Sequence, residues 1–209
     1  GHLSLIKVAK RKCDFVVVSI FVNPAQFGPK EDFSRYPRNL KKDVGLLKKE
    51  AVDLLFYPSV KEMYPEGYKT YVEVSDLGNV LCGASRPGHF RGVGTIVLKL
   101  FNIVQPDIAV FGRKDFQQSV LIKKMAKDLN VNVKIITAPT IREKDGLAMS
   151  SRNTYLNNTE RKNATVLYES LKWAKDAYYK KRIADSHKII KKMKSMINAK
   201  GGRIDYIEV

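Results

Sequence analysis

The sequence predicts an α/β fold in which helices connect the strands of a parallel sheet, followed by a smaller second domain. Short, continuous runs of β-branched and aromatic residues alternate with longer segments whose apolar residues recur at helical spacing. Continuous apolar runs are typical of strands buried on both faces of a parallel sheet. After residue 157 the alternation stops and two helical patterns follow one another. We therefore expect one domain over residues 1–157 and a second over residues 158–209.

The elements of the first domain can be assigned in order along the chain. Strands are predicted at 15–22, 53–57, 71–74, 108–111 and 132–136. Helices are predicted at 3–12, 40–50, 93–104 and 116–129. This alternation indicates parallel strands joined by right-handed crossovers. Ligands bind at the carboxyl ends of such strands, so the segments 23–27 and 112–118 are expected to line a site.

The second domain begins with helices and is expected to be an incomplete α+β unit. Apolar residues recur at helical spacing at Ala164, Leu167, Leu171, Ala174 and Tyr178, and again at Ile183, Ile190, Met193 and Ile197. Gly201 and Gly202 end the second pattern, and residues 204–209 are a predicted strand. Because the chain stops within that strand, we expect the domain to continue past Val209.

The charge raises the alternative of a nucleic-acid-binding protein. The chain has 38 Lys plus Arg against 21 Asp plus Glu, a net charge of +17, and residues 161–200 hold 12 basic and 3 acidic residues. That segment is helical in pattern, so a solvated helix face explains the surplus equally well. The aromatic residues lie mostly inside apolar runs and are not interleaved with basic ones as stacking platforms. A protein that handles anionic nucleotides would show the same bias.

Cysteine usage and hydropathy favour a cytoplasmic protein. Only Cys13 and Cys82 occur, which argues against a disulfide framework. The histidines and cysteines show no zinc-type spacing. No apolar run approaches the roughly 18 residues of a membrane-spanning helix, so we expect no membrane partner.

Two of four polar loops carry a histidine or uncharged amides. Residues 1–4 begin a predicted helix, where backbone N–H groups can bind an anion and His2 can add a hydrogen bond or a proton. A frayed terminus explains the same residues. In the segment 23–27, an amide such as that of Asn23 or Gln26 can bind a hydroxyl or a carboxylate. The alternative there is a turn that Asn23 caps.

The other two loops carry charges suited to a nucleotide. In the segment 112–118, Gly112 permits close approach of a ligand, Lys114 offers a charge for a phosphate, and Asp115 suits a ribose hydroxyl or a helix cap. In the segment 149–153, two serines followed by Arg152 can bind a polyphosphate. The alternative to nucleotide binding is a helix capped by Asp115 for the segment 112–118. For the segment 149–153 it is an ordinary serine-rich loop before a helix. A Walker loop and a dinucleotide fingerprint are both absent from the sequence.

These loops occur together with further segments in one order and spacing. The segments are 1–5 (GHLSL), 22–28 (VNPAQFG), 36–38 (YPR), 86–93 (RPGHFRGV), 99–104 (KLFNIV), 112–118 (GRKDFQQ) and 145–153 (DGLAMSSRN). In this combination the chain resembles the pantoate–β-alanine ligase (pantothenate synthetase) family of the nucleotidyl-transferring α/β superfamily. The resemblance implies a Rossmann-like domain in a cytoplasmic homodimer. It also implies ATP- and Mg²⁺-dependent condensation of (R)-pantoate with β-alanine through a pantoyl adenylate, without nucleic-acid or membrane partners.

The resemblance also implies roles for individual residues. His2 is expected to contact the ATP phosphates and to donate a proton. ATP binding is expected for Gly112, Arg113, Lys114, Asp115, Ile141, Met149, Ser150, Ser151 and Arg152. Gln26 and Gln118 match glutamines that hold pantoate, and Asn23, Arg86 and His89 match supporting residues. The metal ligands are left open, and the family's first signature histidine would precede Gly1.

A different nucleotidyl transferase with the same fold is a further alternative. The pair Gln26 and Gln118 favours a small hydroxy acid over a nucleic acid as the substrate. The first domain, residues 1–157, is therefore expected to bind ATP and pantoate. The second, residues 158–209, is expected to form a lid.

Overall fold

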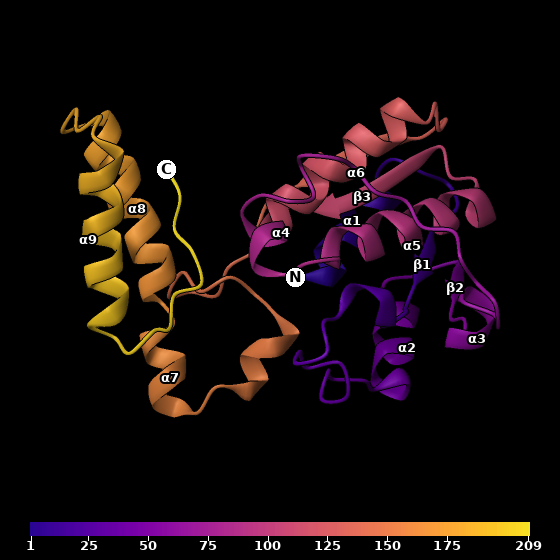
Figure 1. The fold of residues 1–209 in the computed structure, drawn as a ribbon. Coiled ribbons are helices and arrows are strands. Elements are labelled where there is room, and N and C mark those ends of the chain that lie inside the picture. The colour runs from indigo at the N-terminus through magenta and orange to yellow at the C-terminus, as the bar shows by residue number, and fades with distance from the viewer. The chain divides into compact units, whose positions relative to one another are not determined.

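The computed structural model describes residues 1–209, which divide into two compact units (Figure 1). The units comprise Gly1–Thr140 and Ile141–Val209, and each is described by itself. Residues 141–157, which the sequence analysis assigned to the first domain, lie in the second compact unit. The domain boundary expected after residue 157 and the lid role stay predictions.

The first unit contains four parallel strands in two pairs. Strand β1 (Val17–Ser19) pairs with β2 (Leu54–Phe56), and β3 (Ile108–Gly112) pairs with β4 (Lys134–Ala138). Val17 lies opposite Leu54, and Ile108 lies opposite Lys134. The predicted α/β class with parallel strands is thus confirmed. Strand β1 is shorter than the predicted run 15–22, and Phe15 is exposed while Val16 is buried.

The four predicted helices of the first unit form in the predicted order. They are α1 (His2–Lys10), α2 (Leu40–Lys49), α5 (His89–Val104) and α6 (Phe116–Asp128). Two short helices that were not predicted, α3 (Val60–Met63) and α4 (Cys82–Ser85), lie between them, as do two 3₁₀ turns, η1 (Pro24–Gln26) and η2 (Arg113–Asp115). Helix α5 begins four residues before the predicted start at 93. It ends at Val104, since the following Gln105 adopts the left-handed conformation and Pro106 cannot continue the helix.

The core of the first unit lies where α5 and α6 pack together. Its buried residues are Met63, Phe90, Val93, Ile96, Val97, Phe101, Leu121, Ile122, Met125 and Ala126. Side chains of β2, β3 and β4 pack against this cluster from the sheet side, among them Phe56, Ala109 and Ile135. This packing fixes α5 and α6 against the strands, so the loops that follow β1 and β3 have a rigid base.

The strand predicted at 71–74 does not form. The Val72 N–H donates to the Thr95 hydroxyl of α5 at 2.9 Å, so a side chain takes the place of a neighbouring strand. Gly94 lets this segment approach α5 closely, since a Cβ there would lie 3.3 Å from the Val72 carbonyl oxygen. The β-rich composition of the segment is therefore used for packing along a helix.

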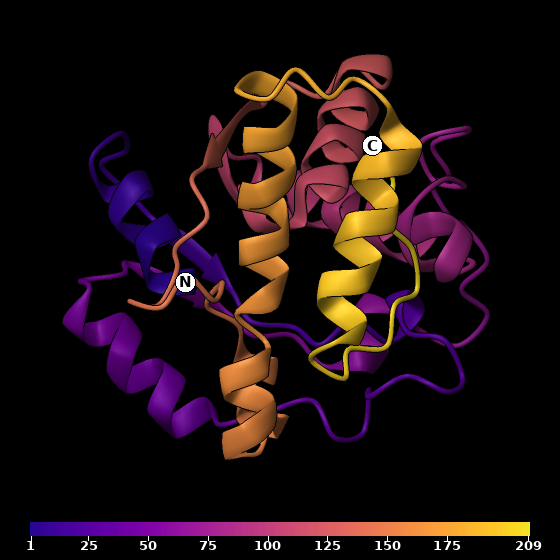
Figure 2. The same ribbon diagram turned by 90° about the vertical axis from the view of Figure 1, so that its left-hand side faces the viewer.

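The second unit consists of a short hairpin and helices. Arg142 and Ala148 form an isolated antiparallel bridge, which is followed by η3 (Ser151–Tyr155), α7 (Asn158–Asn163), α8 (Val166–Tyr179) and α9 (Ser186–Asn198). Helices α8 and α9 lie side by side in both views (Figure 2). The buried residues of α9 are Ile189, Met193 and Ile197.

The first of the two helices expected in the second domain forms as α8, and its apolar stripe is largely exposed, because Leu167, Leu171 and Tyr178 are each 53% exposed. The buried residues of α8 are Val166, Ser170 and Ala177, and α9 packs against this helix. The strand predicted at 204–209 is absent, because a strand needs a hydrogen-bonding neighbour and residues 1–209 offer it none. The lysines of α9 are exposed, as expected for a solvated helix face.

Candidate active site

The loop after β1 is organised around the buried side chain of Asn23. This residue is 2% exposed and caps η1. Its Oδ1 atom accepts hydrogen bonds from the Ala25 N–H at 3.3 Å and from the Tyr64 hydroxyl at 2.8 Å. Its Nδ2 atom donates to the Gly92 carbonyl at 3.0 Å and to Gln26 Oε1 at 3.2 Å. Hydrogen bonds within the protein thus satisfy both ends of the Asn23 amide.

Gln26 is held at both its backbone and its side chain. The Gln26 carbonyl accepts from His89 Nδ1 at 2.8 Å and from the Arg86 guanidinium at 3.4 Å. Its side-chain Oε1 is occupied by Asn23. The Nε2 group is left as a donor without a protein partner. The structure therefore brings Asn23, Gln26, Arg86 and His89 together and leaves the donor of the Gln26 amide unpaired within the protein.

Arg86 is itself fixed by Glu31, a residue that the sequence analysis did not single out. The guanidinium donates to both oxygens of Glu31, at 2.8 and 2.5 Å. This paired geometry adds direction as well as strength. Hydrogen bonding from Arg86 is the main cause that lowers the pKa of Glu31. Nothing in the local sequence marks Glu31, because its partner lies 55 residues further along the chain.

The hydrogen-bond partners of His89 fix its tautomer. Nδ1 faces a carbonyl, so it carries the proton, and Nε2 lies 3.1 Å from the Arg86 guanidinium, so it accepts. Burial is the main cause that lowers the pKa of His89, and the positive charge of Arg86 lowers it further. His89 is therefore neutral near pH 7. Protonation would break the bond from Arg86 and loosen the support of Gln26.

The turn after β3 lies close to the start of α1. Arg113, Lys114 and Asp115 form the exposed turn η2, in which the Lys114 ammonium contacts Asp115 at 3.0 Å. The pKa of the exposed His2 ring is lowered, mainly by partial desolvation and further by positive charges that include Lys114. The structure thus brings His2 and the predicted ATP-binding turn into one region. Gly112 ends β3 and begins this turn.

The two adjacent glutamines of α6 differ in their surroundings. Gln117 Nε2 donates to the carbonyls of Leu77 and Val80 at 2.9 and 2.8 Å, and its Oε1 accepts from the Cys82 N–H at 3.1 Å. It therefore holds the segment before α4. Gln118 is half-buried, and its amide has no hydrogen-bond partner within the protein. The role of Gln118 in binding the acid substrate stays a prediction.

The remaining predicted nucleotide residues lie in the hairpin of the second unit. The Met149 N–H donates to the Ile141 carbonyl at 3.0 Å, so these two residues lie opposite each other with exposed side chains. The Ser150 hydroxyl accepts from the Arg152 N–H at 3.2 Å and caps η3. Ser151 follows in the same turn. Ile141, Met149, Ser150, Ser151 and Arg152 are thus one local cluster.

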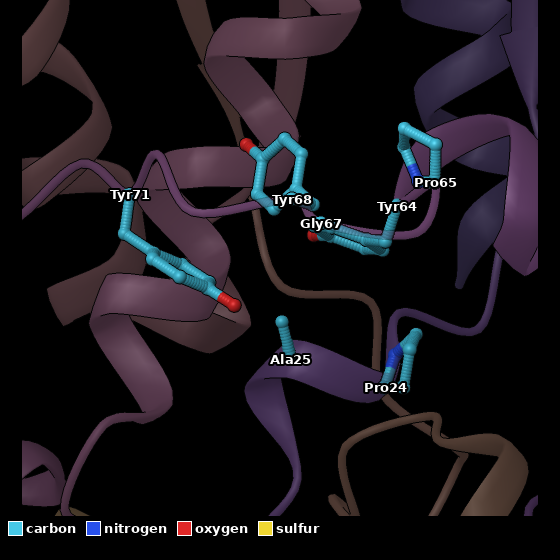
Figure 3. Close-up of a pocket in the computed structure, with 7 residues that line it drawn as sticks. All are labelled: Pro24, Ala25, Tyr64, Pro65, Gly67, Tyr68 and Tyr71. Atoms are coloured by element: carbon cyan, nitrogen blue, oxygen red, sulfur yellow. The ribbon is translucent and has the colours of Figure 1, made fainter.

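A pocket that the sequence analysis missed lies beside η1 (Figure 3). It has a volume of about 420 Å³ and is lined by Pro24, Ala25, Tyr64, Pro65, Gly67, Tyr68 and Tyr71. The three tyrosine rings pack edge to face, with centroids 5.1 and 5.5 Å apart. Lys99 lies over two of the rings and Arg91 over the third. The cluster of tyrosines between residues 57 and 71 is the feature of the sequence that could have located this pocket.

Neither a built metal site nor a membrane span is found among residues 1–209. No three His, Cys, Asp or Glu side chains gather in a metal-binding group. None of the helices combines the length and the apolar character that crossing a membrane requires.

The chain matches one protein family over its whole length. The model of the family described as pantoate-beta-alanine ligase matches residues 1–209. Pantothenate synthetase of Acetivibrio thermocellus is 59% identical over 210 residues, covering 100% of this chain and 74% of that protein. The pantothenate synthetase of Caldicellulosiruptor saccharolyticus is 56% identical over 209 residues, again covering 100% and 74%.

Solved structures show the same fold. The crystal structure of pantothenate synthetase from Thermus thermophilus superposes with a TM-score of 0.90 at 47% identity, covering 95% of this chain and 72% of that one. The pantoate-beta-alanine ligase of Francisella tularensis, solved with beta-gamma ATP and beta-alanine, gives 0.88 at 42% identity, covering 100% and 76%. From its fold, its loops and these matches, the chain belongs to the pantoate-beta-alanine ligase family.

Proposed function

We propose that this protein condenses (R)-pantoate with β-alanine, with cleavage of ATP to AMP and pyrophosphate. The observation that carries this proposal is the family match over all of residues 1–209. The amides of Gln26 and Gln118 support it, because each offers donors that no protein group uses. A small hydroxy acid presents the carboxylate and hydroxyl acceptors that such donors bind.

The reaction has two steps. A carboxylate oxygen of pantoate attacks the α-phosphorus of ATP, the bond to the β-phosphate oxygen breaks, and pyrophosphate leaves. The amine of β-alanine then attacks the acyl carbon of pantoyl adenylate, AMP leaves with the electrons of the acyl–oxygen bond, and the amine loses a proton. Adenylation is needed because a free carboxylate is a poor acyl donor. The chain's task is to position the reactants and to neutralise phosphate charge.

We assign the phosphate contacts to His2, Arg113, Lys114, Ser150, Ser151 and Arg152. Gly112 and Asp115 complete the turn after β3, and Ile141 and Met149 offer apolar contacts to the adenine. His2 has a lowered pKa in the free protein, and the negative charge of a bound triphosphate would raise it again. A bound triphosphate would therefore favour the protonated form of His2, which suits a donor to the leaving pyrophosphate.

The donor set fits Mg²⁺ that arrives with the nucleotide. Residues 1–209 contain no group of three metal-binding side chains, and Mg²⁺ is commonly held by one or two carboxylates together with substrate phosphates. Asp115 is the exposed carboxylate of the turn after β3. When bound, Mg²⁺ would neutralise part of the phosphate charge of the nucleotide. We also infer that the protein is cytoplasmic and forms a homodimer. Light scattering of the purified protein would test the homodimer.

Exchange of labelled pyrophosphate into ATP tests the proposed function. The protein should catalyse exchange only when pantoate and Mg²⁺ are present, and β-alanine should not be required. Nothing in the residue set assigned to the first step depends on the amine. Exchange that proceeds without pantoate, or that requires a different acid, would overturn the proposal.

A further inference from the structure

The orientation of the Gln26 amide decides what this residue can bind. An amide offers a donor or an acceptor according to which end faces the ligand. Asn23 Nδ2 can only donate, so the atom of Gln26 that faces it is Oε1. The Nε2 donor is then the end presented to a ligand. Whatever holds Asn23 in place therefore controls the hydrogen bonding of Gln26.

Asn23 is held by groups with fixed roles. The Ala25 N–H can only donate, and the Gly92 carbonyl can only accept, so these two determine which end of the Asn23 amide is which. The bond from Ala25 is long, at 3.3 Å, whereas the Tyr64 hydroxyl lies 2.8 Å from the same Oδ1 atom. Tyr64 thus makes the shorter of the two bonds to a side chain that is almost fully buried.

The Tyr64 ring is itself fixed in place. Tyr64 directly follows the buried Met63, the last residue of α3. Its ring packs edge-on against Tyr68, and the Lys99 ammonium lies 5.8 Å from its centroid. Figure 3 shows Tyr64 and Tyr68 on the same wall of the pocket, facing the η1 residues Pro24 and Ala25. Burial raises the pKa of Tyr64 to about 12, so its hydroxyl stays a donor at every pH at which the protein is assayed.

We propose that Tyr64 is a positioning residue for the carboxylic-acid substrate, acting through Asn23 on the side-chain amide of Gln26. The Tyr64 hydroxyl holds Asn23 Oδ1, Asn23 Nδ2 holds Gln26 Oε1, and Gln26 Nε2 donates to an oxygen of the acid. Tyr64 does not touch the substrate. The proposal rests on the proposed function, in which Gln26 binds pantoate.

The test compares Tyr64→Phe with Tyr68→Phe. Each variant removes one hydroxyl from the same ring cluster and keeps the ring and its packing, but the Tyr68 hydroxyl has no hydrogen-bond partner within the protein. In pyrophosphate exchange, Tyr64→Phe should raise the KM for pantoate by about 3- to 10-fold, the loss expected for one hydrogen bond. The KM for ATP should change by less than about twofold. Tyr68→Phe should leave both constants unchanged.

A double-mutant cycle separates this route from general loosening of the structure. If Tyr64 acts through Gln26, adding Tyr64→Phe to Gln26→Ala should not weaken pantoate binding further. Calorimetric titration with pantoate measures this in variants whose exchange rate is low. An additive effect, or equal behaviour of Tyr64→Phe and Tyr68→Phe, would overturn the inference while pantoate-dependent exchange still stood. Loss of pantoate dependence in the unaltered protein would instead overturn the proposed function.

Discussion

Replacing Gly92 by alanine should displace the loop that carries Gln26. Helix α5 meets η1 at Gly92, where the helix backbone lies directly against the loop backbone. A Cβ at this position would lie 2.2 Å from the Ala25 carbonyl oxygen and 2.6 Å from the Gln26 nitrogen. Ordinary contacts begin near 3.4 Å, so the two backbones would have to separate by about 1.2 Å. Neither partner is a flexible side-chain end, so the strain cannot be relieved by a change of rotamer.

The consequences should appear in both stability and catalysis. Overpacking of this kind costs about 1–3 kcal/mol of the free energy of unfolding. A displacement of about 1 Å in a substrate-positioning group can lower the rate about 100-fold. The assays are urea unfolding followed by circular dichroism and pyrophosphate exchange with pantoate varied. We expect Gly92→Ala to lower kcat/KM for pantoate much more than its affinity for ATP.

Gly45→Ala is the matched control. Gly45 lies within α2, and a Cβ there would meet nothing within 4 Å. The change should stabilise the helix by about 0.5–1 kcal/mol, since glycine is a poor helix former. Catalysis should be unaffected. A Gly92→Ala protein with unchanged stability and unchanged pantoate kinetics would refute the close approach of α5 to η1 as the reason for glycine at this position.

Three further predictions address other contacts. Glu31→Gln removes the charge that holds Arg86, so the KM for pantoate should rise while the melting temperature falls only slightly, because the pair is partly exposed; an unchanged KM would contradict the support described for Gln26. The pKa of His89 is lowered in the folded protein, so the unfolded chain binds more protons. The free energy of unfolding should therefore be highest above about pH 6.5 and decline as the pH falls through the pKa of folded His89. Urea unfolding at several pH values should show this decline, and His89→Gln should weaken it. Gly146→Ala should destabilise the hairpin by about 1–3 kcal/mol, since φ is +97° there and a Cβ would lie 2.4 Å from the Tyr168 ring; an unaltered melting curve would speak against that strain.

The sequence alone determined the α/β class and most of the elements. Continuous apolar runs located β1 to β4, because strands buried in a parallel sheet are marked by composition over a few adjacent residues. The same local pattern failed at 71–74, where the side chain of Thr95 replaces a neighbouring strand. On α8 the pattern predicted the helix but did not specify its buried face, because Leu167 and Val166 differ by one position in the helical repeat. Only the packing of α9 decides which of the two faces is buried.

For the candidate site, too, the sequence determined some features and the tertiary structure determined the others. Polar residues at the ends of β1 and β3 could be found in the sequence, since loops at strand ends carry their signal within a few residues. The hydrogen bonds that hold Gln26 could not be found in the sequence. Their partners are far apart in the chain: Tyr64 and Asn23 by 41 residues, and Glu31 and Arg86 by 55. Hydrogen bonds act over about 3 Å, so only the folded chain determines which distant groups come within reach. The sequence therefore determined which side chains are available, and the tertiary structure determined which of them hold Gln26 and which way its amide faces.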